Sequence, residues 1–166
     1  MSALRLSALR PTPDEVAEVV ALYASNPEYL RAAGEYDPSD IPVARVEADL
    51  RAEVGTEGCA VLLARDAEDR AVGLLSLLHR HPGDGYPWIG LLMVHGELRR
   101  RGVGRQLVAL VEERFRDQGG DGVRLAVLEN NPTAWTFWNS LGWREVDRRL
   151  DIQHGRPCVV MHKELV

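Results

Sequence analysis

Cysteine is scarce in this sequence, and long apolar runs are missing from it. The two cysteines among 166 residues, Cys59 and Cys158, do not form a Cys-x-x-Cys motif. We therefore expect two buried, reduced thiols and a cytoplasmic location, although the sequence leaves a disulfide between them open. No run approaches the ~18 apolar residues that a membrane-spanning helix needs, and no signal peptide is visible near the N-terminus. We expect no membrane partner.

Basic residues are outnumbered by acidic ones. The sequence has 20 Lys and Arg residues against 25 Asp and Glu residues, which gives a net charge of −5 at pH 7. A nucleic-acid-binding domain generally needs a basic face, so this charge argues against nucleic acid as a partner. The dense basic stretch from Arg99 to Arg101 is flanked by Glu97, Glu112 and Glu113. Hydrophobic residues make up 45% of the chain, which at this length predicts one folded domain over residues 1–166.

The most informative stretch of the sequence joins an apolar run that ends at Val94 to an amphipathic helix that begins near Gly102. The loop between them is rich in arginine and glycine. N–H groups at a helix N-terminus lack intrahelical partners, and the helix dipole favours an anion there. This stretch therefore predicts a cradle for a pyrophosphate. The P-loop pattern is absent, and so is the dinucleotide pattern Gly-x-Gly-x-x-Gly, because position 107 is Leu.

Two motifs together resemble those of a known family. The loop reads Arg-x-x-Gly-x-Gly at Arg99, Gly102 and Gly104. Further along the chain, a strand-like run that ends at Leu128 precedes the pattern Asn-x-x-Ala-x-x-Phe-Trp-x-x-Leu-Gly-Trp, which begins at Asn131. In this order, the two motifs resemble the GNAT family of acyl-coenzyme A-dependent N-acetyltransferases. The resemblance is good over residues 86–146 and weaker elsewhere.

The resemblance implies an α+β fold with a mixed, mostly antiparallel sheet of roughly six to seven strands and about four flanking helices. The splayed centre of this sheet binds acetyl-coenzyme A, the co-substrate, and a bulge is expected in the strand that ends at Val94. The residues expected to contact the coenzyme are Leu92, Met93, Val94, Arg99, Arg100, Arg101, Gly102, Val103, Gly104, Arg105 and Asn131. Asn131 also fits the simpler role of a cap for the helix that Pro132 begins.

Periodicity and turn signals place the elements along the chain. Strands are expected at 4–9, 59–65, 71–79, 88–94, 123–128, 143–152 and 157–164. Helices are expected from residue 13 on, over 43–53, over 102–118 and after Asn131. Residues 25–42 contain three prolines, so turns and short helical pieces are expected there.

The expected reaction is attack of a neutral primary amine on the thioester carbonyl. A backbone N–H near Val94 is the expected stabiliser of the oxyanion, an effect worth ~3 kcal/mol. Where the family usually has a tyrosine that protonates the leaving thiolate, this chain has Trp138, whose indole N–H is a donor but not a useful acid. A second function therefore stays open, namely an acyl-coenzyme A-binding module of the same fold with little or no turnover.

No single residue stands out as the general base. Glu129 is a candidate, although a surface or helix-capping carboxylate fits it as well. His79 and His81 lie near the expected cleft, and no metal is expected because no third ligand accompanies them. By resemblance, residues 23–40 cover the acceptor, and their acidic and tyrosine side chains suit a cationic amine. The acceptor is expected to be a small-molecule or peptide amine, and a homodimer stays open.

Overall fold

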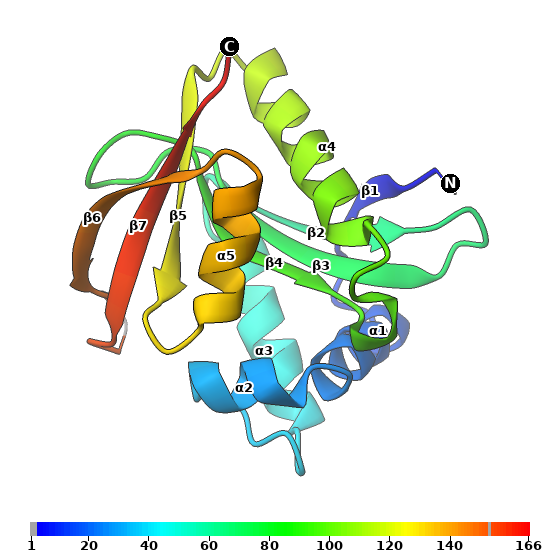
Figure 1. The fold of residues 1–166 in the computed structure, drawn as a ribbon. Coiled ribbons are helices and arrows are strands. Elements are labelled where there is room, and N and C mark those ends of the chain that lie inside the picture. Colours follow the sequence, from blue (N-terminus) through cyan, green and yellow to red (C-terminus); the bar gives the residue numbers. More distant parts are fainter. Residues whose placement is uncertain (1–2, 153) are drawn as a thin grey trace.

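A computed structural model describes residues 3–152 and 154–166. The protein is built around one seven-stranded sheet (Figure 1). The strand order is β1-β2-β3-β4-β5-β7-β6, and neighbouring strands are antiparallel except for β4 and β5, which are parallel. The strands are β1 (Arg5–Ala8), β2 (Cys59–Arg65), β3 (Ala71–Leu78), β4 (Trp88–Val94), β5 (Gly122–Leu128), β6 (Arg144–Leu150) and β7 (Pro157–Glu164).

Helices cover both faces of the sheet. They are α1 (Pro13–Ala24), α2 (Pro27–Ala33), α3 (Val43–Val54), α4 (Val103–Asp117) and α5 (Pro132–Ser140), with a short 3-10 helix η1 (Gly96–Leu98) after β4. The first three α-helices pack on one face, and α4 and α5 pack on the other (Figure 1). Proline stands in the first turn of α1, α2 and α5, where its missing N–H would have had no intrahelical partner.

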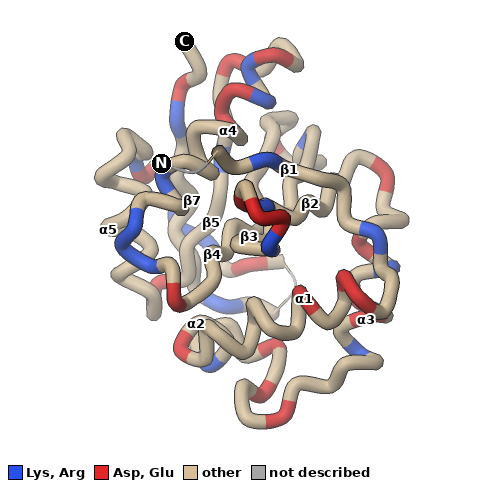
Figure 2. The backbone as a smooth tube through the Cα atoms, turned by 90° about the vertical axis from the view of Figure 1, so that its right-hand side faces the viewer, with Lys and Arg blue, Asp and Glu red and all other residues tan. Residues whose placement is uncertain are grey.

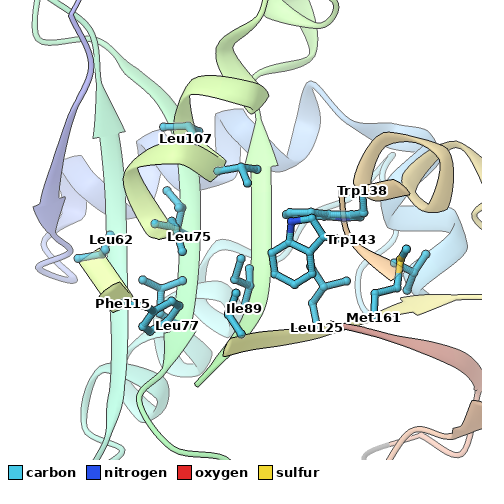
Figure 3. Packing of buried hydrophobic residues seen from close by; sticks show 14 of the residues in the cluster. Leu62, Leu75, Leu77, Ile89, Leu107, Phe115, Leu125, Trp138, Trp143 and Met161 are labelled. Carbon is cyan, nitrogen blue, oxygen red and sulfur yellow. The ribbon is translucent and has the colours of Figure 1, made fainter. Parts of the chain in front are cut away.

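Alternation along the strands divides the core into two layers. In β2, Leu62 packs in the layer beneath α4 and α5, whereas its neighbour Val61 packs in the layer beneath α1, α2 and α3. Trp138 of α5 and Trp143 lie side by side in the first layer, with ring centroids 5.1 Å apart (Figure 3). The short helix α5 is therefore anchored to the sheet largely through aromatic packing.

The sheet opens at its centre because β4 and β5 separate. Among the described strand pairs, only Trp88 and Ile89 of β4 pair with β5, whereas β5 pairs with β7 along its whole length. The pairing of β3 with β4 is irregular at the same point. Ser76 pairs with Leu91 while the next pair on the ladder involves Ile89, so Gly90 is the extra residue of a bulge. The expected bulge and splayed centre are both confirmed.

The expected elements are found, with two refinements. The proline-rich segment 25–42 contains a full helix, α2, which ends at Gly34 in the left-handed conformation (φ 74°). The described residues thus form five α-helices rather than about four. Strand β6 begins after Trp143, which is 1% exposed and belongs to the core. Both cysteines are free thiols, and Cys158 is buried as expected, whereas Cys59 is only half-buried. None of the described helices is both long and apolar enough to span a bilayer.

Candidate active site

The loop between β4 and α4 forms a cradle of backbone N–H groups. Gly102, at the N-cap of α4, adopts a left-handed conformation (φ 81°), and a Cβ added there would meet nothing within 4 Å. The first intrahelical bond runs from Gln106 N to Gly102 O at 3.1 Å, so the N–H groups of residues 103–105 precede any helical acceptor. Arg100 and Arg101 are exposed beside them. This arrangement of N–H groups, helix dipole and arginines suits a pyrophosphate.

Gly104 lies where α4 approaches α5. A Cβ added at Gly104 would lie 3.2 Å from Phe137 Cζ and 3.7 Å from a methyl carbon of Val94. The glycine therefore has a packing role that the sequence did not reveal, because a side chain here would push against an aromatic ring. Its place in the first turn of α4 also keeps the backbone accessible to a ligand.

Arg99 is exposed like its neighbours Arg100 and Arg101, but its guanidinium contacts the corner between α1 and α2. Its Nη2 donates to Asn26 Oδ1 at 2.6 Å. Asn26 is 3% exposed and donates through Nδ2 to the Val94 carbonyl at 3.0 Å and to the Leu22 carbonyl at 3.0 Å. The role of Arg99 as a phosphate ligand stays a prediction, whereas its contact with Asn26 is a finding. The signal for this corner in the sequence was the Asn26–Pro27 pair, which reads only as a helix start.

Strand β4 presents part of its backbone to the splay. His95 N donates to Val72 O of β3 at 2.8 Å. In an antiparallel ladder the bonded residues alternate, so the N–H groups of Leu92 and Val94 face away from β3, toward the gap beside β5. The N–H group of Met93 points toward β3 instead, and its side chain, only 5% exposed, packs in the core. Of the three expected strand residues, Leu92 and Val94 therefore offer open N–H groups.

The gap between β4 and β5 reaches solvent on the face that carries α1, α2 and α3. Gly90 and Ala126 are exposed although both belong to central strands. Ala126 pairs with Val160 of β7 on one side, while β4 has already separated from β5 on the other. An acceptor that enters over Gly90 and Ala126 would arrive next to the open N–H groups of Leu92 and Val94.

The two polar residues after β5 make structural contacts. Asn131 caps α5, because its Oδ1 accepts from Ala134 N at 3.2 Å. Its coenzyme contact stays a prediction that this cap does not preclude. Glu129 is exposed and accepts from Arg148 Nη1 at 3.0 Å. Its role as the base also stays a prediction, and the ion pair holds its carboxylate at the surface.

The expected histidines and tyrosines lie in different parts of the fold. His81 stacks on Trp88 at 4.4 Å, at the end of β4 opposite to Val94. In the described part of the chain, no three metal-ligand side chains gather around it or elsewhere. Tyr23 belongs to α1, and its ring centroid lies 5.4 Å from that of Tyr36 in the core layer on this face. Burial raises the pKa of Tyr29 to about 12, and the carboxylate of Glu35 adds to this shift.

Comparison with known proteins agrees with this geometry. The sequence matches the model of the acetyltransferase (GNAT) family over residues 18–143. The fold is similar to that of an acetyltransferase from Thermus thermophilus, with a TM-score of 0.78, 22% identity, and 98% of this chain and 97% of that chain covered. No curated protein matches the chain.

Two further solved structures share the fold. A spermidine N-acetyltransferase from Vibrio cholerae, in complex with CoA and spermine, gives a TM-score of 0.75 at 17% identity, with 98% of this chain and 95% of that chain covered. The ribosomal-protein-S18-alanine N-acetyltransferase from Escherichia coli gives 0.69 at 14% identity, with 98% and 94% covered. Because the family model spans most of the sequence, the chain belongs to the GNAT family of acetyltransferases, enzymes that use acetyl-coenzyme A.

Proposed function

We propose that this protein transfers an acetyl group from acetyl-coenzyme A to a primary amine by direct attack of the amine on the thioester. The observation that carries the proposal is the juxtaposition of two unpaired sets of N–H groups. One set begins α4 after Gly102, and the other lies on the open edge of β4 at Leu92 and Val94. A long ligand with a pyrophosphate at one end and amides at the other would satisfy both sets.

The residues of the loop and strand have separate roles in this proposal. The N–H groups from Arg100 to Arg105 hold the pyrophosphate, with Arg100 and Arg101 adding charge. The open edge of β4 pairs with the pantetheine amides. The coenzyme supplies an activated acetyl group as a thioester. The N–H of Val94 faces the splay and receives the charge that develops on the carbonyl oxygen, an effect worth ~3 kcal/mol.

The acceptor side supports an amine of positive charge. Acidic residues recur along α1 and α3, which pack on the same face of the sheet (Figure 2), and four of them are paired with arginines, namely Glu15, Glu18, Glu47 and Asp49. Tyrosines 23, 29 and 36 lie in the same layer. The Vibrio cholerae enzyme of similar fold is a spermidine N-acetyltransferase, and the Escherichia coli one modifies a protein alanine. Both a small polyamine and a peptide amine therefore belong in the first test.

The test measures coenzyme A release from acetyl-coenzyme A with a panel of polyamines, amino acids, aminoglycosides and peptides. Turnover on at least one amine is the expected result. In parallel, acetyl-coenzyme A at 100 times its dissociation constant is expected to stabilise the fold by ~2.7 kcal/mol. Stabilisation without turnover on any amine would favour the binding module instead. No change in melting temperature at millimolar coenzyme would contradict both functions.

A further inference from the structure

A carboxylate of α3 reaches the sheet beside the bulge of β4. Glu53 Oε1 accepts a hydrogen bond from Ser76 Oγ on β3. Ser76 pairs with Leu91, and a Cβ added at Gly90 would lie 3.6 Å from Ser76 Oγ. Leu91 belongs to the layer beneath α1, α2 and α3, so Glu53 and Ser76 lie on the face of the sheet that carries these helices, next to the exposed bulge.

The groups that surround this carboxylate are neutral or acidic. Cys59 Sγ lies 3.7 Å from Ser76 Oγ. Burial, followed by the neighbouring tyrosines and the charges of Glu53 and Glu35, raises the pKa of Tyr23. The ion pairs within α3 join Arg45 to Asp49 and Arg51 to Glu47, and none over residues 3–152 and 154–166 includes Glu53.

A half-buried carboxylate without a cationic partner is an unusual feature, because such a charge is normally paired. Glu53 and Ser76 are both half-buried, and so is Tyr23, whose pKa the charge of Glu53 helps to raise. A carboxylate near a tyrosine is a suitable environment for an ammonium group, which gains from both the charge and the ring face. The ammonium group would thereby complete the ion pair that the chain itself does not make.

We infer that Glu53, held by Ser76, receives the ammonium group of the acceptor and takes its proton before attack. The inference rests on the proposed function, which it deepens by naming the residue that makes the amine nucleophilic. Val94, the proposed oxyanion donor, is four residues beyond Gly90, so its N–H lies about 13 Å along the strand from the bulge. The acceptor nitrogen therefore sits over the open edge of β4 between the two, and its proton reaches Glu53 through water.

The acetyl transfer balances in atoms and charge. The acceptor R–NH3+ gives one proton to the Glu53 carboxylate, and the freed lone pair forms the nitrogen–carbon bond to the acetyl group. The carbon–sulfur bond breaks, and its electron pair leaves with sulfur. The second proton of the nitrogen goes to that sulfur, and the products are the acetylated amine, coenzyme A as a thiol, and protonated Glu53.

The experiment compares two acceptors on Glu53→Gln, which keeps the hydrogen bond to Ser76. One acceptor is the best alkyl amine of the panel, and the other is its fluorinated analogue, whose amine is neutral at the assay pH. Glu53→Gln is expected to lower kcat/KM about 100-fold for the alkyl amine. For the analogue, kcat/KM of the variant is expected to stay within about threefold of the wild-type value. Coenzyme affinity, measured by calorimetry, is expected to stay unchanged. Ser76→Ala is expected to give a smaller loss of the same kind.

The matched control is Glu57→Gln, which makes the same charge change at an exposed position just beyond α3 and is expected to leave both rates unchanged. Equal losses on the two acceptors, or full activity of Glu53→Gln on the alkyl amine, would overturn the inference while leaving the proposed function intact. A wild-type chain that binds coenzyme but acetylates no amine would overturn the inference and the proposed function together.

Discussion

The side-chain amide of Asn26 fixes the end of β4 by donating to the carbonyl of Val94 at 3.0 Å. The same corner accepts a second bond, because Gly96 N donates to Ser25 Oγ at 2.9 Å. A Cβ at Gly96 would lie 2.0 Å from the Ser25 carbonyl oxygen, so only glycine permits this approach. The peptide that follows the proposed oxyanion donor is thus held by the α1–α2 corner, which also contacts Arg99.

Replacement of Asn26 tests whether this corner sets the position of the coenzyme strand. Asn26→Ala leaves the Val94 carbonyl and the Arg99 guanidinium without their partner. We expect a loss of ~1–3 kcal/mol in unfolding free energy and weaker acetyl-coenzyme A binding, measured by urea denaturation and calorimetry. Asn139→Ala, at an exposed position of α5, is the control and is expected to change neither quantity. Normal coenzyme affinity in folded Asn26→Ala would confine the corner to a role in stability.

Gly104 has two roles that a pair of variants can separate. Gly104→Ala places a Cβ 3.2 Å from Phe137 Cζ, so we expect a lower melting temperature and weaker coenzyme binding. Phe137→Leu in the same chain makes room for the added methyl group. The double variant is expected to regain melting temperature but not coenzyme affinity, because the methyl group still obstructs the approach to the backbone. Recovery of both would show that packing against Phe137 is the whole reason for glycine.

Local patterns in the sequence predicted most of the fold. Helix starts at Pro13 and Pro132, the strand that ends at Val94 and the glycine turn into α4 are all encoded within a few residues, so periodicity and capping locate them. The family resemblance implied a bulge in the strand that ends at Val94, and Gly90 within that strand is compatible with one. The short helical pieces expected in residues 25–42 include α2, which Pro27 begins and Gly34 ends, although its bounds were not predicted.

The candidate site was predictable only where its residues are contiguous. The cradle from Arg100 to Arg105 is one continuous segment that runs from the loop into the first turn of α4, so its motif could be recognised. The contact of Asn26 with Val94 joins residues 68 positions apart, and no spacing pattern encodes it. Likewise, Glu129 was considered as a base for its place after β5, but its ion pair with Arg148 arises only when β6 folds beside β7.

The hairpin loop between β6 and β7 is expected to make stability depend on pH. Burial raises the pKa of Asp151, but the Arg156 guanidinium and the N–H groups of His154 and Arg156 lower it by more than burial raises it. The resulting pKa is about 2. Because the folded pKa is below the unfolded value of ~3.9, the charged form stabilises the fold above pH ~4, and this contribution is lost as the pH falls toward 2. The loop matters for α2, since Arg156 also donates to the Ala33 carbonyl.

Asp151→Asn should therefore cost about 2 kcal/mol of unfolding free energy near pH 7, and the difference from wild type should shrink below pH ~4. Urea denaturation at several pH values measures both. Asp147→Asn changes an exposed ion pair with Arg149 and is expected to cost no more than about 1 kcal/mol. A cost for Asp151→Asn that stays constant from pH 7 to pH 3 would mean that its charge is not the stabilising feature.

Trp138 is expected to pack rather than to act as an acid. Its side chain is 7% exposed, and its ring meets those of Phe137 and Trp143 edge to face, with centroids 5.1 Å away in each case. The indole of Trp143 is itself buried, with no hydrogen-bond partner for its Nε1 among the described residues. Trp138→Ala should therefore cost ~3–5 kcal/mol of stability.

Steady-state kinetics on conservative variants separates packing from chemistry at this position. Trp138→Phe keeps a ring against Phe137 and Trp143, so most of the turnover should remain once an accepted amine is known. Trp138→Tyr adds the phenol that the family resemblance implies at this position, and an increase in turnover would show that thiolate protonation limits the wild-type rate. A Trp138→Phe variant that folds and binds coenzyme normally, yet loses a hundredfold or more in turnover, about 2.7 kcal/mol of barrier, would show that the indole N–H takes part.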